Sequence, residues 1–320
     1  CEMIDSNESV KDALIGDSVD FNTHDGKIAS MPFAVVRPIG MFYNQKSMTP
    51  PKDISSMSIA EFGQFLEDND QKMAFMTAEN AWTTSLFFTA IVAEKDGGIE
   101  MLKDGVTNYV TDYTTDFWVE AFTELQYFLQ TNASSNTLGA AYADAANSFM
   151  STSSGVIANG PWMVGDFSEA SADKWSNGFT GDDVMPTVYP GNVAIATFTG
   201  YNWWVPADLP EGESEAALAF LAFINSPEEI EAFMLAEGGI APNLDKSEAF
   251  KVELSENRLL NEIDASVTAE TVFTPRATDV MPPSVNNEEF GKLLPKLIDD
   301  SMTPIEFAQA ISAKAVEAME

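Results

Sequence analysis

Short apolar runs with strand character alternate with amphipathic helical segments along most of this 320-residue chain. The runs that favour strands are 27–36, 40–43, 73–76, 155–158, 184–188 and 201–205, and the helical segments are 82–93, 117–129, 140–150, 213–225 and 227–237. Such alternation predicts helices layered on sheets, which is an α/β architecture. At about 100–200 residues per domain, the length predicts about two domains or lobes.

Three further segments carry the signals that start a helix. Residues 58–61, Ser-Ile-Ala-Glu, form a capping box, in which the serine hydroxyl and the glutamate carboxylate bond each other's backbone amides. Residues 226–229 and 303–306 combine a hydroxyl N-cap, a proline at the first helical position and a glutamate at the third. We therefore expect helices to begin at these three places, and Gly238 to end the helix that starts at Pro227.

The charge of the chain excludes some classes of partner. Acidic residues number 50 and basic residues 16, which gives a formal net charge of −34. Such a surface repels phosphate backbones, so we expect no nucleic-acid partner, and it disfavours anionic membranes. With 45% hydrophobic and 21% charged residues, the chain has the composition of an ordered globular protein.

Cysteine and histidine are almost absent. Cys1 is the one cysteine and His24 the one histidine, which excludes an internal disulfide, a cysteine zinc site and a multi-histidine metal site. Asp20, Asn22 and Asp25 loosely resemble a calcium-binding loop, but their spacing does not fit, and a solvated turn explains them better. We expect no metal and no other cofactor.

Membrane association is not indicated by any long apolar run. The longest, residues 86–93, falls far short of the ~18 apolar residues of a membrane span and predicts a buried helix. The sequence begins at Cys1 with no signal peptide. Cys1 could carry a lipid anchor, but the amphipathic segment 10–15 close behind it favours a chain that starts inside a domain.

Adjacent acidic pairs are candidates for catalysis. They are Asp182-Asp183, Glu228-Glu229, Glu288-Glu289 and Asp299-Asp300. Among 50 acidic residues such pairs arise by chance, and those at helix starts complement the helix dipole. We therefore expect no enzyme. The alternative from that class is a glycoside-acting enzyme, which needs two carboxylates about 5–9.5 Å apart across a cleft.

Aromatic residues at strand ends indicate a binding surface instead. Trp162 follows Asn159-Gly160-Pro161 at a strand-to-helix turn, and Trp82 begins a helix shortly after Glu79. Ligands of open α/β sheets bind at the carboxyl ends of strands, where an indole can stack on the apolar face of a sugar. Trp162 could instead be a core residue that covers the helix start.

Residues 201–204 place two tryptophans on a predicted strand. Their order is Tyr201, Asn202, Trp203, Trp204. Successive side chains of a strand point to opposite faces. Of two neighbouring residues in this run, one can therefore face a cleft while the other packs inward.

The order of these segments resembles a known family along nearly the whole chain. The segments are GKIASMPFA at 26–34, MFYNQK at 41–46, GVIANGPW at 155–162 and the helical region 217–242 with its closing Gly and Pro. They resemble the extracellular solute-binding proteins of bacterial ABC importers, in the carbohydrate-binding group that includes maltose-binding protein. The pattern identifies the family and no individual sugar.

The resemblance implies a two-lobed periplasmic-binding-protein-like (Venus flytrap) α/β fold with a ligand cleft between the lobes. By similarity, residues 1–36 and 203–250 form the N-terminal lobe and residues 40–199 and 251–320 the C-terminal lobe. The crossing strands are expected near 36–40, 199–203 and 250. The first strand–helix units of the family precede the equivalent of Cys1, so we expect the sequence to be a fragment of a longer chain.

The resemblance also implies binding residues. Trp162 matches the sugar-stacking tryptophan of the family, and Glu79 matches a polar residue that bonds sugar hydroxyls. The family has an aromatic residue beside this polar one. Ala81 occupies the nearest matching position in this chain, so we expect Trp82 to take the role of that aromatic. The other candidates for ligand binding are Asn159, Arg37, Tyr201, Asn202 and Trp203.

Two departures from the maltose-binding member argue against maltodextrin as the ligand. Val36 stands where that member has an acidic residue, and Asn286-Asn287 stand where it has another aromatic. Arg37, next to Val36, could pair with an anionic ligand, but a strand-capping or solvent-facing role is the favoured interpretation.

By resemblance, the chain is the substrate-binding component of an ABC importer. It binds a carbohydrate, expected to be an oligosaccharide, and passes it to the transmembrane subunits of a permease. We expect a monomer in an extracytoplasmic location, periplasmic or as a cell-surface lipoprotein. The alternative within this class is a non-sugar solute: a polyol, a glycerol phosphate compound or a peptide. A structural or adhesive surface protein is a third interpretation.

Overall fold

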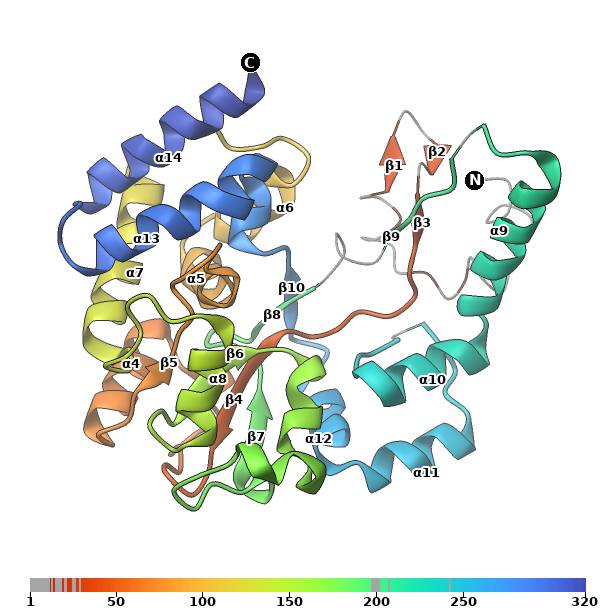
Figure 1. The fold of residues 1–320 in the computed structure, drawn as a ribbon, viewed down its shortest axis with the longest axis horizontal. Helices are drawn as coiled ribbons and strands as arrows, with labels where there is room; N and C mark the ends of the chain where they lie inside the picture. The colour runs from red at the N-terminus through yellow and green to blue at the C-terminus, as the bar shows by residue number, and fades with distance from the viewer. Residues whose placement is uncertain are drawn as a thin grey trace. The chain divides into compact units, whose positions relative to one another are not determined.

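The computed structural model describes residues 12, 14, 19, 22–24, 27–28, 30–196, 202–206, 208–241 and 243–320 (Figure 1). Cys1, Asp20, Asp25 and Tyr201 lie outside these residues. The chain divides into two compact units, of which the first comprises Cys1–Pro38 and Ala196–Ala265 and the second Ile39–Ile195 and Ser266–Glu320. The assignment of lobes made from the sequence stays a prediction.

The second unit is built on a mixed sheet in the strand order β5-β6-β4-β7. Its strands are β4 Gly40–Asn44, β5 Met73–Ala74, β6 Val156–Asn159 and β7 Val184–Thr187. The central strand β4 is antiparallel to both neighbours, with Phe42 opposite Ile157 of β6 and Pro186 of β7, whereas β5 runs parallel to β6. A separate parallel pair joins β8, Val193–Ile195, to β10, Val272–Thr274.

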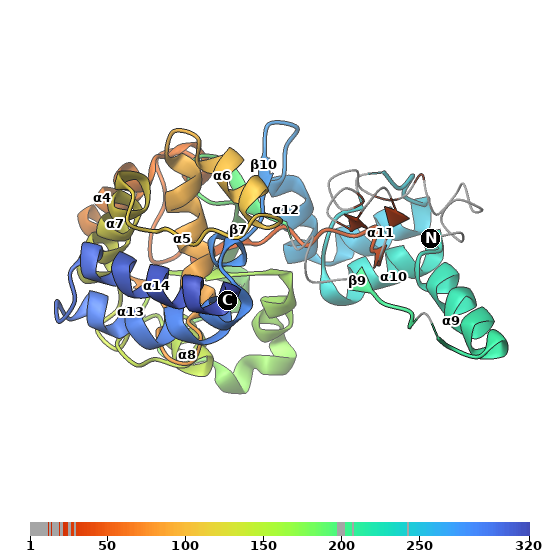
Figure 2. The same ribbon diagram turned by 90° about the horizontal axis from the view of Figure 1, so that it is seen from above.

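Helices surround this sheet. They are α4 Ile59–Asp68, α5 Trp82–Glu94, α6 Gly98–Gly105, α7 Asp116–Asn132, α8 Tyr142–Met150, α13 Phe290–Ile298 and α14 Pro304–Met319. Short 3-10 helices are η1 Ile54–Ser56, η2 Pro161–Phe167, η3 Glu169–Lys174, η4 Gly181–Asp183 and η5 Ala277–Val280, and η6 Val285–Glu289 is a π-helix. Helices α13 and α14 lie side by side and both pack on α7 (Figure 1 and Figure 2).

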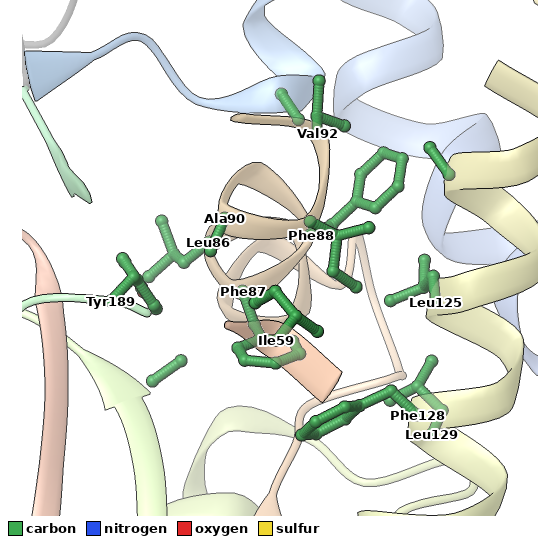
Figure 3. Close-up of a cluster of buried hydrophobic side chains, with 14 of the residues drawn as sticks. Ile59, Leu86, Phe87, Phe88, Ala90, Val92, Leu125, Phe128, Leu129 and Tyr189 are labelled. Atoms are coloured by element: carbon green, nitrogen blue, oxygen red, sulfur yellow. The ribbon is translucent and has the colours of Figure 1, made fainter. Parts of the chain in front are cut away.

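Helix α5 forms the centre of the core. Its side chains from Thr83 to Ala93 are all buried, because the sequence is apolar or hydroxyl-bearing on every face. Figure 3 shows its Phe87 and Phe88 among Leu125 and Phe128 of α7. The rings of Phe87 and Phe128 have centroids 4.4 Å apart, so α7 covers one side of α5 closely.

The hydroxyls of Thr84 and Thr89 inside α5 form hydrogen bonds with the backbone. Thr89 donates to the carbonyl of Ser85 at 2.8 Å and accepts from the amide of Ala277 at the same distance. Thr84 donates to the carbonyl of Met76, the residue that follows β5 by two positions. These bonds satisfy buried polar groups and tie α5 to two other segments of the unit.

The first unit holds two small antiparallel pairs. Strand β1 Thr23–His24 pairs with β2 Lys27–Ile28, and β3 Met31–Pro32 pairs with β9 Asn202–Trp203. Its helices are α9 Glu211–Ile224, α10 Pro227–Glu237, α11 Glu248–Glu256 and α12 Arg258–Ser266. The predicted run 27–36 is therefore two short strands, followed by a single bridge from Val36 to Ile240.

The predicted helix starts agree with the structure in most respects. The capping boxes at Ser58 and Thr303 are complete. Ser226 occupies the N-cap of α10 with Pro227 after it, but its side chain makes no capping bond. Gly238 ends that helix with a φ of 71°, a conformation that favours glycine.

Candidate ligand-binding site

The turn that precedes α5 holds Glu79 in an exposed position. A backbone hydrogen bond closes this turn: the amide of Ala81 donates to the carbonyl of Ala78 at 3.0 Å. Glu79 and Ala81 have φ values of 56° and 52°, in the left-handed region that residues with a side chain seldom adopt. The amides of Thr77 and Ala78 both donate to the carbonyl of Ala140 at 2.9 Å, so the segment before α8 supports the turn.

Helix α13 supports the same turn through Gly291. A methyl group at Gly291 would lie 2.1 Å from the carbonyl oxygen of Glu79 and 2.6 Å from the α-carbon of Asn80. Two stretches of backbone therefore touch, and glycine is the residue that allows this. The approach joins the start of α13, next to the π-helix η6, to the turn that presents Glu79.

Three aromatic side chains meet beside this turn. We call Trp82, Tyr142 and Trp162 the aromatic cluster. The rings of Trp82 and Tyr142 are stacked, with centroids 5.5 Å apart and planes 17° from parallel. Trp162 lies on Trp82 with a centroid distance of 5.9 Å and a tilt of 49°. All three residues are half-buried, so each keeps part of its surface exposed.

Local sequence explains the position of Trp162. Strand β6 ends at Asn159, and Pro161 begins the 3-10 helix η2, where the sequence indicated a helix without specifying its type. Gly160 has extended backbone angles, and a methyl group there would lie 2.2 Å from the indole of Trp162. The indole therefore lies against the α-carbon of Gly160.

Asn159 supports the aromatic cluster through the hydrogen bonds of its side chain. Its side chain is 1% exposed, and its amide nitrogen donates to the hydroxyl of Tyr142 at 3.2 Å and to the sulfur of Met163 at 3.0 Å. Its amide oxygen accepts from the backbone amide of Gly160 at 2.9 Å. These bonds use both ends of the amide, so Asn159 connects β6, α8 and η2. Its contact with a ligand stays a prediction.

Arg37 belongs to the first unit and has an internal partner. Its guanidinium lies 3.3 Å from the carboxylate of Glu237 and 5.8 Å from the centre of the Phe233 ring. The residue is 8% exposed, and burial lowers the pKa of the guanidinium while the charge of Glu237 opposes that shift. An anionic ligand at Arg37 would compete with Glu237. A binding role for Arg37 stays a prediction.

The predicted binding residues at 201–203 also fall in the first unit. Asn202 and Trp203 form β9, which is shorter than the expected strand. Trp203 is 40% exposed with its ring edge-on to Phe220, and Trp204 is 68% exposed. Neither tryptophan packs inward, contrary to the alternation expected for a longer strand.

Neither a metal centre nor a membrane span is found among the described residues. In that part of the chain, no group of three or more His, Cys, Asp or Glu side chains is placed to hold a metal ion. No helix there is both long and apolar enough to cross a membrane.

Comparison with known proteins identifies the family. The profile described as "Bacterial extracellular solute-binding protein" matches residues 3–260, which is well over half of the chain. The chain belongs to this family. Its members are extracellular, so the extracytoplasmic location of this solute-binding protein follows from membership. A comparison with curated protein sequences finds no significant match.

Solved structures show the fold of this solute-binding protein. A Streptococcus pneumoniae solute-binding protein, in complex with the blood group A-trisaccharide, is 19% identical with a TM-score of 0.73, over 99% of this chain and 78% of that one. A chitin oligosaccharide binding protein is 17% identical with the same TM-score, over 100% and 79%. A cyclic alpha-maltosyl-1,6-maltose binding protein from Arthrobacter globiformis is 15% identical with a TM-score of 0.64, over 99% and 79%. The expected two-lobed α/β fold is confirmed.

The structure brings together Trp82, Trp162 and Asn159, with Glu79 on the turn before Trp82. Sequence reasoning missed Tyr142, which completes the aromatic cluster. In the sequence, the signal for Tyr142 was only weak. This residue lies near the start of the predicted helix 140–150, where an aromatic residue is equally compatible with simple packing. Its stacking on Trp82 and its hydrogen bond with Asn159 distinguish it.

Proposed function

We propose that this solute-binding protein binds a carbohydrate on its aromatic cluster and delivers it to the transmembrane subunits of an ABC importer. The observation that supports this best is the stacked pair of Trp82 and Tyr142 with Trp162 beside it, all three partly exposed. The residues that support the proposal all belong to the second unit.

The chemistry of the cluster suits a sugar. A pyranose ring has faces of C–H groups and a rim of hydroxyls. Indole faces remove water from the C–H groups, and each aromatic contact contributes about 1 kcal/mol beyond its buried area. The exposed carboxylate of Glu79 can accept hydrogen bonds from hydroxyls, and bonds to an ionised acceptor are about twice as strong as neutral ones.

The ligands of the structural relatives agree with this class. The Streptococcus protein was solved with a trisaccharide, and the second relative is described as binding chitin oligosaccharides. At 19% and 17% identity they give no individual sugar for this chain. Trp82 and Trp162 are both partly exposed, and two neighbouring indoles offer more stacking area than one sugar ring covers, which favours an oligosaccharide.

We also propose that the protein releases its ligand unchanged and acts as a monomer. Binding and release need no nucleophile or general base, and the aromatic cluster offers none. Incubation with chromogenic glycosides gives no coloured product under this proposal. Steady release of the chromophore by pure protein would support the glycoside-acting enzyme instead.

The direct test is a titration of intrinsic tryptophan fluorescence with a panel of neutral mono- and oligosaccharides, confirmed by calorimetry. We expect one saccharide class to give a saturable change. Trp162→Ala should weaken that binding about tenfold or more, since ~1.4 kcal/mol corresponds to a factor of ten. Tyr127→Ala is the control, because this tyrosine is 63% exposed on α7 and belongs to no ring pair described here.

The outcomes separate the interpretations. A folded protein, by circular dichroism, that responds to no saccharide overturns the proposal and favours a non-sugar solute, with Arg37 the next residue to test. Equal loss of binding in Trp162→Ala and Tyr127→Ala would also contradict the assigned position of the site.

A further inference from the structure

Tyr142 connects three elements of the candidate site. It is the first residue of α8, its ring is stacked on Trp82 at the start of α5, and its hydroxyl accepts a hydrogen bond from Asn159 at the end of β6. Tyr142 therefore contacts other residues of the candidate site through both its ring face and its hydroxyl.

The stack limits the orientation of Trp82. An indole at the first position of a helix has several side-chain rotamers open to it, since no preceding turn of helix restricts it. The ring of Tyr142 lies nearly parallel to the indole, with 17° between the planes, and the ring of Trp162 is tilted by 49° to it. With Tyr142 in place, one orientation of the Trp82 ring is favoured before any ligand arrives.

Asn159 in turn holds Tyr142. Its amide nitrogen reaches the phenol oxygen at 3.2 Å, and its amide oxygen is fixed by the backbone of Gly160 at 2.9 Å. The direction of the amide is therefore set by the main chain, and the phenol oxygen is held where the amide points. A chain of contacts runs from the Gly160 backbone through Asn159 and Tyr142 to Trp82.

We infer that Tyr142 is a positioning residue, which pre-orients Trp82 for stacking on the ligand. The inference rests on the proposed function, because it assigns Trp82 to that site. A ligand that had to order the indole itself would lose affinity to the entropy of ordering. Tyr142 avoids that loss without needing to touch the ligand.

The test compares Tyr142→Phe with Tyr142→Leu. Phenylalanine keeps the ring and removes the hydroxyl, whereas leucine fills space without an aromatic face. We expect Tyr142→Phe to bind the identified saccharide within about threefold of the unchanged protein, and Tyr142→Leu about tenfold more weakly. Rescue by phenylalanine distinguishes stacking from a general structural role. The inference is overturned if Tyr142→Leu binds as well as the unchanged protein, or if both variants lose affinity equally.

A second measurement needs no ligand. Interacting indoles give a characteristic circular dichroism signal, and Trp82→Phe and Trp162→Phe identify the part that comes from this pair. That part should persist in Tyr142→Phe and be lost in Tyr142→Leu, while thermal unfolding shows that both remain folded. If the protein binds no saccharide, the proposed function fails, but this signal still tests the positioning of Trp82. Persistence of the signal in Tyr142→Leu overturns the inference.

Discussion

The indole of Trp162 rests on the α-carbon of Gly160, two residues before it. A methyl group at Gly160 would lie 2.2 Å from Cζ3 and 2.3 Å from Cη2 of the indole. The backbone angles of Gly160, φ −126° and ψ 179°, are open to any residue. Glycine is therefore needed at this position for space and not for conformation, and the space it leaves is filled by a candidate ligand-binding ring.

Gly160→Ala should displace the indole and weaken ligand binding while the backbone remains unchanged. Overpacking of this kind costs about 1–3 kcal/mol, and part of it will be relieved by rotation of the ring out of the aromatic cluster. Saccharide titration measures the loss of affinity, and thermal unfolding measures the loss of stability. Gly165→Ala in the same 3-10 helix is the matched control, because a methyl group there meets nothing within 4 Å. Equal affinity of both variants would show that the position of Trp162 does not matter for binding.

Gly291→Ala should disturb the turn that presents Glu79. The added methyl group would lie 2.1 Å from the Glu79 carbonyl, and backbone cannot rotate away as a side chain can. We expect a loss of about 1–3 kcal/mol in the free energy of unfolding, measured with urea, together with weaker saccharide binding. Gly212→Ala in α9 has nothing within 4 Å of the new methyl group. That control should be neutral or up to about 1 kcal/mol more stable, because alanine favours helix. A Gly291→Ala protein as stable as the control would contradict the close approach.

Local signals in the sequence predicted much of the second unit. The capping box at Ser58 places the start of α4, and the apolar run after Trp82 predicts α5 to within one residue of its observed end at Glu94. The Asn-Gly-Pro turn after β6 correctly places Trp162 at a strand end. In each case the deciding interaction lies within a few residues along the chain.

Features set by distant residues were not predictable in the same way. Strands β8 and β10 are three residues each and exist because Val193 pairs with Val272 far along the chain. Helices α11 and α12 are a different case, because Phe250 and Leu254, and then Leu259, Leu260 and Ile263, are buried at helical spacing, a local signal that the prediction did not use. Tyr142 is part of the site through its contact with Trp82, which precedes it by 60 positions in sequence. The sequence contains no local signal for the pairing of β8 with β10 or for the stacking of Tyr142 on Trp82.

Tyr189→Phe should leave the protein equally stable or more stable. The ring of Tyr189 is fully buried near Phe87, and its hydroxyl has no hydrogen-bond partner among the described residues. Burial raises the pKa of this phenol, so it stays neutral, and removing an unpaired buried hydroxyl restores about 1 kcal/mol. Denaturant unfolding measures the change. Tyr142→Phe is the comparison, because it removes a hydroxyl that Asn159 does bond. A clear loss of stability in Tyr189→Phe would indicate that a bound water pairs with the hydroxyl.

Glu94→Gln should stabilise the protein at neutral pH. Both carboxylate oxygens of Glu94 lie 3.2 Å from the amide of Ile59 at the start of α4. Burial raises the pKa of Glu94; repulsion from Glu124 adds to the shift, and the Ile59 amide and Lys95 oppose it. The folded protein therefore binds this proton more tightly than the unfolded chain does. Below about pH 4.3, the ordinary pKa of glutamate, the full stabilisation from this group is present. It is lost as the pH rises through the raised pKa that Glu94 has in the folded protein.

Glutamine mimics the protonated acid and can still accept from the Ile59 amide. The advantage of Glu94→Gln over the unchanged protein should therefore be small at about pH 4 and grow toward about pH 7, as measured by urea unfolding at each pH. Glu61→Gln is the matched control, because Glu61 lies in the first turn of α4, the helix whose Ile59 amide Glu94 accepts from. A hydrogen bond from the Ser58 amide lowers the pKa of Glu61, and Lys52 lowers it further. The stabilisation that Glu61 provides is therefore present above the ordinary pKa of glutamate and is lost on acidification. Glu61→Gln should thus destabilise at neutral pH, with a difference that shrinks in acid. If both variants changed stability in the same direction with pH, burial would not be the cause of the shift at Glu94.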